Sequence, residues 1–258
     1  HSRQRGPMTH VLVTRPIEAA QQLADQLGVL GLSPVAMPFY TFAARRPGID
    51  LSVTWSVEKT RKLAVFTSPR AVQFGLAYLP GQNMPGDLEV AVVGSATRAS
   101  LEAAGYPVHI QADSGFTSED LLQAPGLAEN PGVAVIFCAP EGRETIAEGL
   151  QSLGWKTEKA MVYERVPLQP DPGQLARLRN CGDLISIWTS VSALKIAEQY
   201  LPRDVWGKIL ASPALVISSR IQHHLKQLGA SSVELADGPG NPELLRSVAR
   251  LKGQQGVG

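Results

Sequence analysis

The feature of this sequence that most constrains its fold is an internal repeat. Short segments of the first half return in the second half at a nearly constant spacing of 122 to 124 residues. Phe66-Thr67-Ser68 returns as Trp188-Thr189-Ser190, and Tyr40 returns as Tyr163. The other matching pairs are Leu30-Gly31 with Leu153-Gly154, Gly105 with Gly229, and Ala112-Asp113 with Ala236-Asp237. A period of this length is too long for a solenoid and predicts two domains that share one fold.

Short apolar runs rich in β-branched residues alternate with amphipathic stretches of helix length. The runs are apolar along their whole length, which is typical of parallel strands covered by helices on both faces. The expected strands are residues 11–13, 63–66, 90–93, 133–137, 184–188 and 215–217. The pattern therefore predicts an α/β protein with Rossmann-like parallel sheets.

Two extended segments, residues 38–47 and 160–167, carry aromatic residues and end in proline, as paired strands between two domains would. We expect linker strands at 35–45 and 161–167. One domain is then 46–160, and the other is discontinuous and combines 9–34 with 168–252. Such a double link would act as a hinge beside a cleft. Residues 1–7 precede Met8 without any periodicity, and we expect them to be a cloning remnant outside the fold.

Composition limits the cellular compartment and the classes of partner that we expect for this chain. With 24 basic and 23 acidic residues there is no charge excess to attract nucleic acid or an anionic membrane. The longest apolar runs are too short to cross a bilayer. Only Cys138 and Cys181 are present, without CxxC spacing, and we see no signal peptide, which indicates reduced thiols in the cytoplasm.

Hydroxyl residues, glycine and arginine stand where the expected strands meet the following helices. In a doubly wound sheet these junctions lie at the carboxyl ends of the strands, where helix N-termini bind anions. The junctions are residues 14–16, 67–70, 94–98, 139–143, 189–192 and 218–220. Ordinary helix capping explains any one of them, but six junctions with four arginines favour a carboxylate or phosphate ligand. Those arginines are Arg15, Arg98, Arg143 and Arg220. Each of them is also compatible with a surface position or an ion pair. We expect Arg98 and Arg70 to lie deeper in their helices than the other junction residues.

Tyr163 is a candidate proton donor because a phenol in a linker strand would face the cleft and is neutral at physiological pH. Plain aromatic packing in a strand pair is the alternative. The sequence has no GxGxxG, P-loop, HExxH or GxSxG motif, which disfavours a nucleotide or flavin enzyme. His223 and His224 are adjacent and diverge on a helix, so we expect no metal site.

In their order and spacing, the junction segments make residues 11–251 resemble the uroporphyrinogen-III synthase family. The segments that carry the resemblance are Val13-Thr14-Arg15-Pro16, Phe66-Thr67-Ser68-Pro69-Arg70-Ala71-Val72, Val93-Gly94-Ser95-Ala96-Thr97, Gly142-Arg143, Val162-Tyr163-Glu164-Arg165, Trp188-Thr189-Ser190-Val191-Ser192-Ala193-Leu194 and Ile217-Ser218-Ser219-Arg220. The chain departs from an exact repeat at one turn, since the glycine at position 94 has no counterpart in the segment that begins at Ser218.

The resemblance implies two flavodoxin-like domains joined by a two-stranded β linker, and a monomeric, cofactor-independent lyase of haem biosynthesis. It implies that linear hydroxymethylbilane loses water through an azafulvene and closes through a spiro intermediate to uroporphyrinogen III, with its last ring, ring D, inverted. It assigns Tyr163 as the catalytic residue that helps the hydroxyl to leave. The implied substrate contacts are Arg15, Ser68, Gly94, Ser95, Thr97, Arg143, Ser190, Ser218, Ser219 and Arg220. The alternative is a non-catalytic two-lobed protein that binds a small polyanion.

Overall fold

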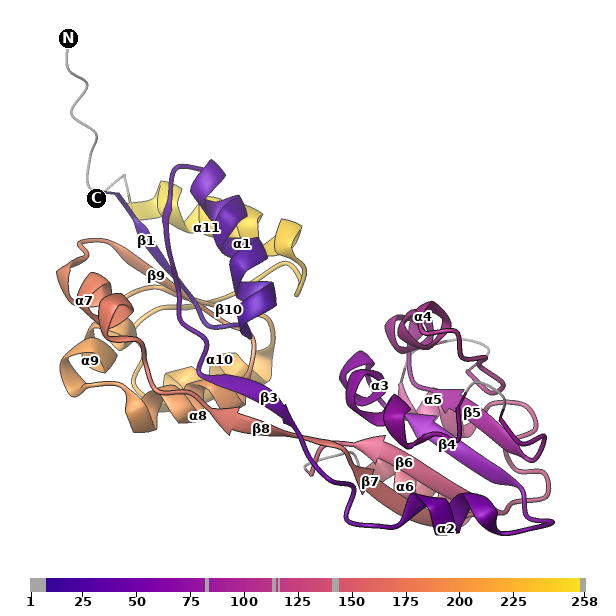
Figure 1. The fold of residues 1–258 in the computed structure, drawn as a ribbon. Helices are drawn as coiled ribbons and strands as arrows, with labels where there is room; N and C mark the ends of the chain where they lie inside the picture. Colours follow the sequence, from indigo (N-terminus) through magenta and orange to yellow (C-terminus); the bar gives the residue numbers. More distant parts are fainter. Residues whose placement is uncertain (1–7, 82–83, 113–114, 116, 141–143, 256–258) are drawn as a thin grey trace. The chain divides into compact units, whose positions relative to one another are not determined.

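The computed structural model describes residues 8–81, 84–112, 115, 117–140 and 144–255. It divides the chain into two compact units (Figure 1). Unit 1 comprises His1–Thr41 together with Val166–Gly258, and unit 2 comprises Phe42–Arg165. The chain therefore leaves unit 1 once and returns to it once. Within the described residues no helix is long and apolar enough to cross a membrane.

Unit 1 contains a five-stranded sheet in the order β11-β10-β9-β1-β2, and every neighbouring pair is parallel. Its strands are β1 His10–Val13, β2 Ser33–Ala36, β9 Leu184–Trp188, β10 Ala214–Val216 and β11 Val233–Leu235. If the five strands are numbered 1 to 5 in chain order within the unit, the sheet reads 2-1-3-4-5 from β2 to β11. This is the flavodoxin-like strand order.

Helices cover both faces of the unit 1 sheet (Figure 1). Helices α1 and α11 lie on one face, where Leu23 and Leu244 pack with Val11 and Ile185 of the sheet. The other four helices lie on the opposite face. The helices are α1 Ile17–Val29, α7 Pro172–Asn180, α8 Val191–Tyr200, α9 Arg203–Ala211, α10 Ser219–Gln227 and α11 Asn241–Gln255. Burial on both faces is the physical reason that the strands are apolar along their whole length.

Unit 2 contains a four-stranded parallel sheet in the order β5-β4-β6-β7. The strands are β4 Lys62–Phe66, β5 Leu88–Val92, β6 Val133–Cys138 and β7 Lys156–Met161. Helices α2, α3 and α4 contribute to the apolar core on one face, and α5 and α6 contribute to the core on the other. The helices are α2 Leu51–Ser56, α3 Pro69–Gly75 with the 3₁₀ turn η1 Leu76–Tyr78, α4 Ser95–Ala103, α5 Ser118–Leu122 and α6 Glu144–Ser152.

The repeat in the sequence is visible in both units. Ile110 forms a parallel bridge with Ala91 at the place in unit 2 that β11 occupies in unit 1. The repeated glycines have positive φ angles, 74° at Gly31, 94° at Gly154, 81° at Gly105 and 95° at Gly229. Each lies just after a helix, where a left-handed residue ends the helix and glycine adopts that conformation without strain. This requirement explains why the glycines recur.

A separate two-stranded sheet pairs β3 Tyr40–Ala44 with β8 Tyr163–Pro167. Two flanking hydrogen bonds fix its direction, because Arg45 N donates to Val162 O and Leu168 N donates to Phe39 O, each at 2.9 Å. Residue numbers rise along one strand as the numbers of the bonded residues fall along the other, so the strands are antiparallel. The predicted fold class, two flavodoxin-like parallel-sheet domains with a two-stranded β linker, is confirmed.

Candidate active site

In each unit the predicted site residues gather at the carboxyl edge of the parallel sheet. In unit 2, Ser68 follows β4, Gly94 follows β5, and Tyr163 lies just after β7. In unit 1, Arg15 follows β1 and Ser190 follows β9. The carboxyl ends of parallel strands meet at one edge, and this edge is where such sheets bind ligands. The remaining described candidates at these edges are Ser95 and Thr97 of unit 2 and Ser218, Ser219 and Arg220 of unit 1.

Tyr163, the first residue of β8, is held by three side chains of unit 2. Its hydroxyl lies 3.3 Å from Ser68 Oγ. The Phe74 ring stacks on the tyrosine ring with centroids 5.7 Å apart, and the Phe42 ring meets its edge at the same centroid distance. The whole residue is only 9% exposed. The phenol is therefore fixed in one orientation, with the Ser68 hydroxyl as a polar neighbour in the described chain.

Ser68 has a second task, because it is the N-cap residue of α3. Its backbone is extended, with φ −164° and ψ 160°, and its Oγ accepts a hydrogen bond from Ala71 N at 3.1 Å. A serine hydroxyl has one proton and two lone pairs. Because Ala71 uses one lone pair, the proton of Ser68 is available for the oxygen of Tyr163. In that arrangement the Tyr163 proton is left to be donated to another group.

Arg70 lies over the Phe42 ring that contacts Tyr163, and the expectation that it sits deep in its helix is wrong. Helix α3 begins at Pro69, so Arg70 is in the first turn. Its guanidinium carbon lies 4.3 Å from the centroid of the Phe42 ring, and Nη1 donates to Gln73 Oε1 at 3.2 Å. Arg70 thus extends the cluster formed by Tyr163 and Phe42 with a cation. The signal that could have found it is the proline at the first helical position, which marks where a helix begins.

The junction serines are mostly helix caps, so the capping interpretation accounts for their positions. Ser190 Oγ accepts from Ser192 N at 3.1 Å, and Ser218 Oγ accepts from Ile221 N at 3.4 Å. Gly94 takes the same place before α4 in another way, with φ 84° and no side-chain cap. A residue without Cβ adopts that angle freely. The two turns therefore depart from the repeat in how they begin a helix: the Ser218 side chain caps α10, whereas Gly94 precedes α4 without a side-chain cap.

Two further candidates of unit 2 differ in accessibility. Ser95, the first residue of α4, is exposed, whereas Thr97 in the same turn is only 2% exposed. Arg98, the fourth residue of α4, donates to Glu102 Oε1 at 2.7 Å and to Gln111 Oε1. Ser95 is therefore the more available of the two hydroxyl residues.

The arginines of unit 1 differ in their surroundings. Arg15 Nη1 donates to Asn241 Oδ1 at 2.8 Å, and Nη2 donates to the Pro239 carbonyl at 2.5 Å, so Arg15 connects the β1 to α1 turn with the start of α11. Burial lowers the pKa of the Arg15 guanidinium from its ordinary value. Arg220, in the first turn of α10, is exposed to solvent. Arg143 falls outside the described residues.

The described part of the chain contains no cluster of side chains suited to cysteine or metal chemistry. Cys138 and Cys181 are both buried and free. Burial raises the pKa of the Cys138 thiol, which disfavours its reactive thiolate. Among the residues described here, no three His, Cys, Asp or Glu side chains gather as a metal site would require.

Comparison with known proteins identifies the relatives of this chain. The family model described as uroporphyrinogen-III synthase HemD matches residues 21–246. The chain belongs to the uroporphyrinogen-III synthase family. A uroporphyrinogen-III synthase of Salmonella typhimurium strain LT2 is 29% identical over 246 residues, which cover 92% of this chain and 99% of the relative. One from Escherichia coli strain K12 is 26% identical over 245 residues, with the same shares covered.

Solved structures of uroporphyrinogen-III synthases share the fold. The enzyme of Helicobacter pylori 26695 matches with a TM-score of 0.63 at 18% identity, covering 95% of this chain and 100% of that one. A mutant enzyme of the extremely thermophilic bacterium Thermus thermophilus matches with a TM-score of 0.58 at 17% identity, covering 95% and 99%. The predicted membership of the uroporphyrinogen-III synthase family is confirmed, and the alternative of a non-catalytic binding protein is not favoured.

Proposed function

We propose that this chain converts linear hydroxymethylbilane into uroporphyrinogen III, with loss of one water molecule and inversion of the last pyrrole ring. Membership of the uroporphyrinogen-III synthase family is the observation that carries the proposal. The reaction needs no redox step, because the atoms and electrons of the substrate equal those of the ring-closed product plus one water molecule. The task of the protein is to hold the flexible substrate so that the substituted carbon of the last ring attacks, because proximity and orientation select between competing closures.

In the first step Tyr163 donates its phenolic proton to the hydroxyl of the substrate, which leaves as water. The remaining bilane is an azafulvene in its protonated, cationic form, and the substrate returns a proton to the phenolate before the cycle ends. The 3.3 Å contact between Ser68 Oγ and the Tyr163 hydroxyl supports this role. When the serine donates to the phenol oxygen, it favours the phenolate that forms as the proton leaves.

The carboxylates of the substrate are bound by residues at the strand ends of both units. Ser95 and Arg70 supply an exposed hydroxyl and a guanidinium in unit 2, and Arg220 supplies an exposed guanidinium in unit 1. Planar guanidinium groups suit carboxylates because they bind them with two parallel hydrogen bonds. The other proposed contacts are Arg15, Ser68, Gly94, Thr97, Arg143, Ser190, Ser218 and Ser219.

We also propose the domain boundaries and the working state of the enzyme. Residues 35–45 and 161–167 act as the linker between domain 46–160 and the domain formed by 9–34 with 168–252, and the pairing of β3 with β8 supports this division. The enzyme works as a cytoplasmic monomer without a cofactor. The two buried, free cysteines are compatible with a reducing compartment.

The test supplies freshly made hydroxymethylbilane to the purified protein, then oxidises the product and separates the porphyrin isomers. The parent chain should produce the type III isomer faster than the spontaneous formation of type I. Only type I product at the spontaneous rate would refute the proposed function.

Tyr163→Phe tests the role of the phenol, and we expect it to lower kcat by about 100-fold, the lower range for loss of a general acid. Tyr40→Phe is the matched control, because Tyr40 is the repeat counterpart of Tyr163 in unit 1. Unchanged thermal unfolding of both variants would separate catalysis from stability. A Tyr163→Phe enzyme as fast as the parent would remove this residue from the mechanism and leave the synthase assignment intact.

A further inference from the structure

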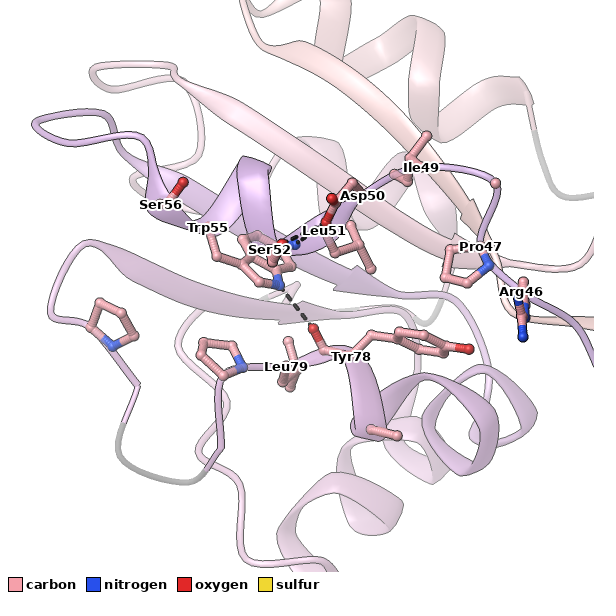
Figure 2. Close-up of a pocket in the computed structure, with 14 residues that line it drawn as sticks. Arg46, Pro47, Ile49, Asp50, Leu51, Ser52, Trp55, Ser56, Tyr78 and Leu79 are labelled. Atoms are coloured by element: carbon pink, nitrogen blue, oxygen red, sulfur yellow. Dashed lines mark hydrogen bonds between the residues drawn. The ribbon is translucent and has the colours of Figure 1, made fainter.

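Unit 2 contains a cavity of about 960 Å³ that the proposed reaction does not use (Figure 2). It lies between α2 with its preceding segment and the end of η1. All of its lining residues belong to unit 2. The volume is in the upper part of the range, about 300 to 1,000 Å³, that small-molecule sites occupy.

The cavity is separate from the Tyr163 site. Ser68, Arg70 and Tyr163 do not line it, whereas Ala77 and Tyr78 do. Ser68 precedes the first residue of α3, and Tyr78 is the last residue of η1. The ten residues from one end of this helical run to the other span roughly 14 Å at 1.5 Å per residue. The Trp55 side of the cavity therefore lies at the opposite end of α3 and η1 from the proposed catalytic phenol. The Arg46 end lies nearer to the strand of Tyr163, because Arg45 N donates to the carbonyl of Val162 at 2.9 Å.

A fixed aromatic wall forms one side of the cavity. The indole Nε1 of Trp55 donates to the Tyr78 carbonyl at 2.8 Å, which joins α2 to η1 (Figure 2). Leu51 and Leu79 lie beside this wall, and both are buried. Trp55 is 9% exposed and the polar atom of its indole is already satisfied, so the part of the ring that lines the cavity is apolar. The wall suits a flat hydrophobic body.

The charged groups of the lining are unequal in availability. The Asp50 side chain caps α2, since Oδ1 accepts from Ser52 N at 3.1 Å and also from Ser52 Oγ. Arg46 is exposed, and no described residue forms a hydrogen bond or ion pair with its side chain. Figure 2 shows Arg46 at one end of the cavity, and the Tyr78 ring reaches towards that same end. The positive charge of the lining thus lies at one end, at Arg46, whereas the negative charge of Asp50 is held by its hydrogen bonds at the start of α2.

We propose that this cavity binds a small aromatic acid, with the ring system against Trp55 and the anionic group at Arg46 and Tyr78. An unpaired guanidinium supplies the charge complementarity, and the apolar walls exclude a fully polar anion such as free phosphate. None of the proposed substrate contacts lines the cavity, so its occupancy is measured without hydroxymethylbilane.

The test uses two fluorescent probes that share one ring system. One is 8-anilinonaphthalene-1-sulfonate, and the other is its uncharged parent, N-phenyl-1-naphthylamine. The sulfonate probe should bind the native full-length chain at one site, with a dissociation constant on the order of 10 µM. Arg46→Ala should weaken the sulfonate probe about tenfold and change the uncharged probe less than twofold, because only the former uses the guanidinium.

Two more variants make the result specific. Ala77→Trp places an indole in the cavity from an exposed position, and it should abolish binding of both probes. Arg246→Ala removes the same charge from α11 of unit 1 and should leave both affinities unchanged. Thermal unfolding of each variant confirms that the probes report on folded protein.

Several results would overturn the proposal. They are absence of sulfonate-probe binding below about 1 mM, unchanged binding to Ala77→Trp, or an equal loss of both probes in Arg46→Ala. Probe affinity that falls as the protein is concentrated, together with a dimer in light scattering, would show that a second copy covers the cavity instead.

Discussion

Ser68 offers a sharp test of how the phenol of Tyr163 is prepared for proton donation. Its Oγ accepts from Ala71 N at 3.1 Å and lies 3.3 Å from the Tyr163 hydroxyl. Ser68→Ala removes both interactions. Ser68→Gly also removes the contact with the phenol, but glycine is a tolerated N-cap residue. The two variants therefore separate helix capping from the support of Tyr163.

The expected magnitudes follow from these two contacts. Loss of a serine N-cap to alanine costs about 1 kcal/mol of unfolding free energy, and replacement by glycine costs a few tenths. The hydrogen bond to Tyr163 contributes about 0.5 to 1 kcal/mol in both cases. We expect the free energy of unfolding to fall by about 1.5 to 2 kcal/mol in Ser68→Ala and by about 1 kcal/mol in Ser68→Gly. If the contact contributes a similar energy to the transition state, kcat should fall about two- to fivefold in both variants.

Urea unfolding measures the stabilities, and initial rates of type III product from fresh hydroxymethylbilane measure kcat. A double-mutant cycle with Tyr163→Phe completes the assay, because Ser68→Gly should have no further effect once the phenol is absent. If Ser68→Gly turns over like the parent while Ser68→Ala is slow, the serine acts only through its helix. Multiplicative losses in the double variant would equally refute the coupling.

Two further predictions concern stability, both measured by urea unfolding. Gly132→Ala would place a Cβ against the backbone oxygen of Arg61, so we expect the free energy of unfolding to fall by about 2 kcal/mol or more. Gly182→Ala is the control, because no atom lies within 4 Å of its added Cβ, and it should change the free energy of unfolding by less than about 0.5 kcal/mol. Lys62 is 2% exposed and its Nζ lies 2.5 Å from Asp87 Oδ2, so Asp87→Ala should cost about 3 kcal/mol by leaving a buried cation unpaired. The double variant with Lys62→Met should recover most of that loss, and a double variant no more stable than the single one would contradict this account.

The sequence predicted the architecture well because the architecture depends on local patterns. Fully apolar strand runs indicated parallel sheets buried on both faces, and β1 and β9 are buried along nearly their whole length. The glycines at 31 and 154 mark helix ends that require positive φ. These features follow from the chain itself, and the family resemblance was carried by the same segments in the same order.

The sequence predicted the members of the candidate site but not their partners. Ser68 and Tyr163 were each identified, yet nothing in their spacing indicates that their hydroxyl groups lie 3.3 Å apart. Arg70 was expected to lie deeper in its helix, but α3 begins at Pro69, so Arg70 lies in the first turn. Arg15 was expected to bind an anion, and its hydrogen bond with Asn241 joins residues 226 positions apart.

Local sequence therefore determined the repeated α/β pattern, the helix caps and the turns, because backbone preferences and the alternation of apolar residues act over a few positions. Only the tertiary structure decided which side chains meet, including the cluster around Tyr163 and the cavity beside Trp55. These contacts join α3, α2 and the β3 to β8 sheet, and they depend on strand order and on helix packing across the sheet faces. Such distances are set by the close packing of the whole unit rather than by any segment of it.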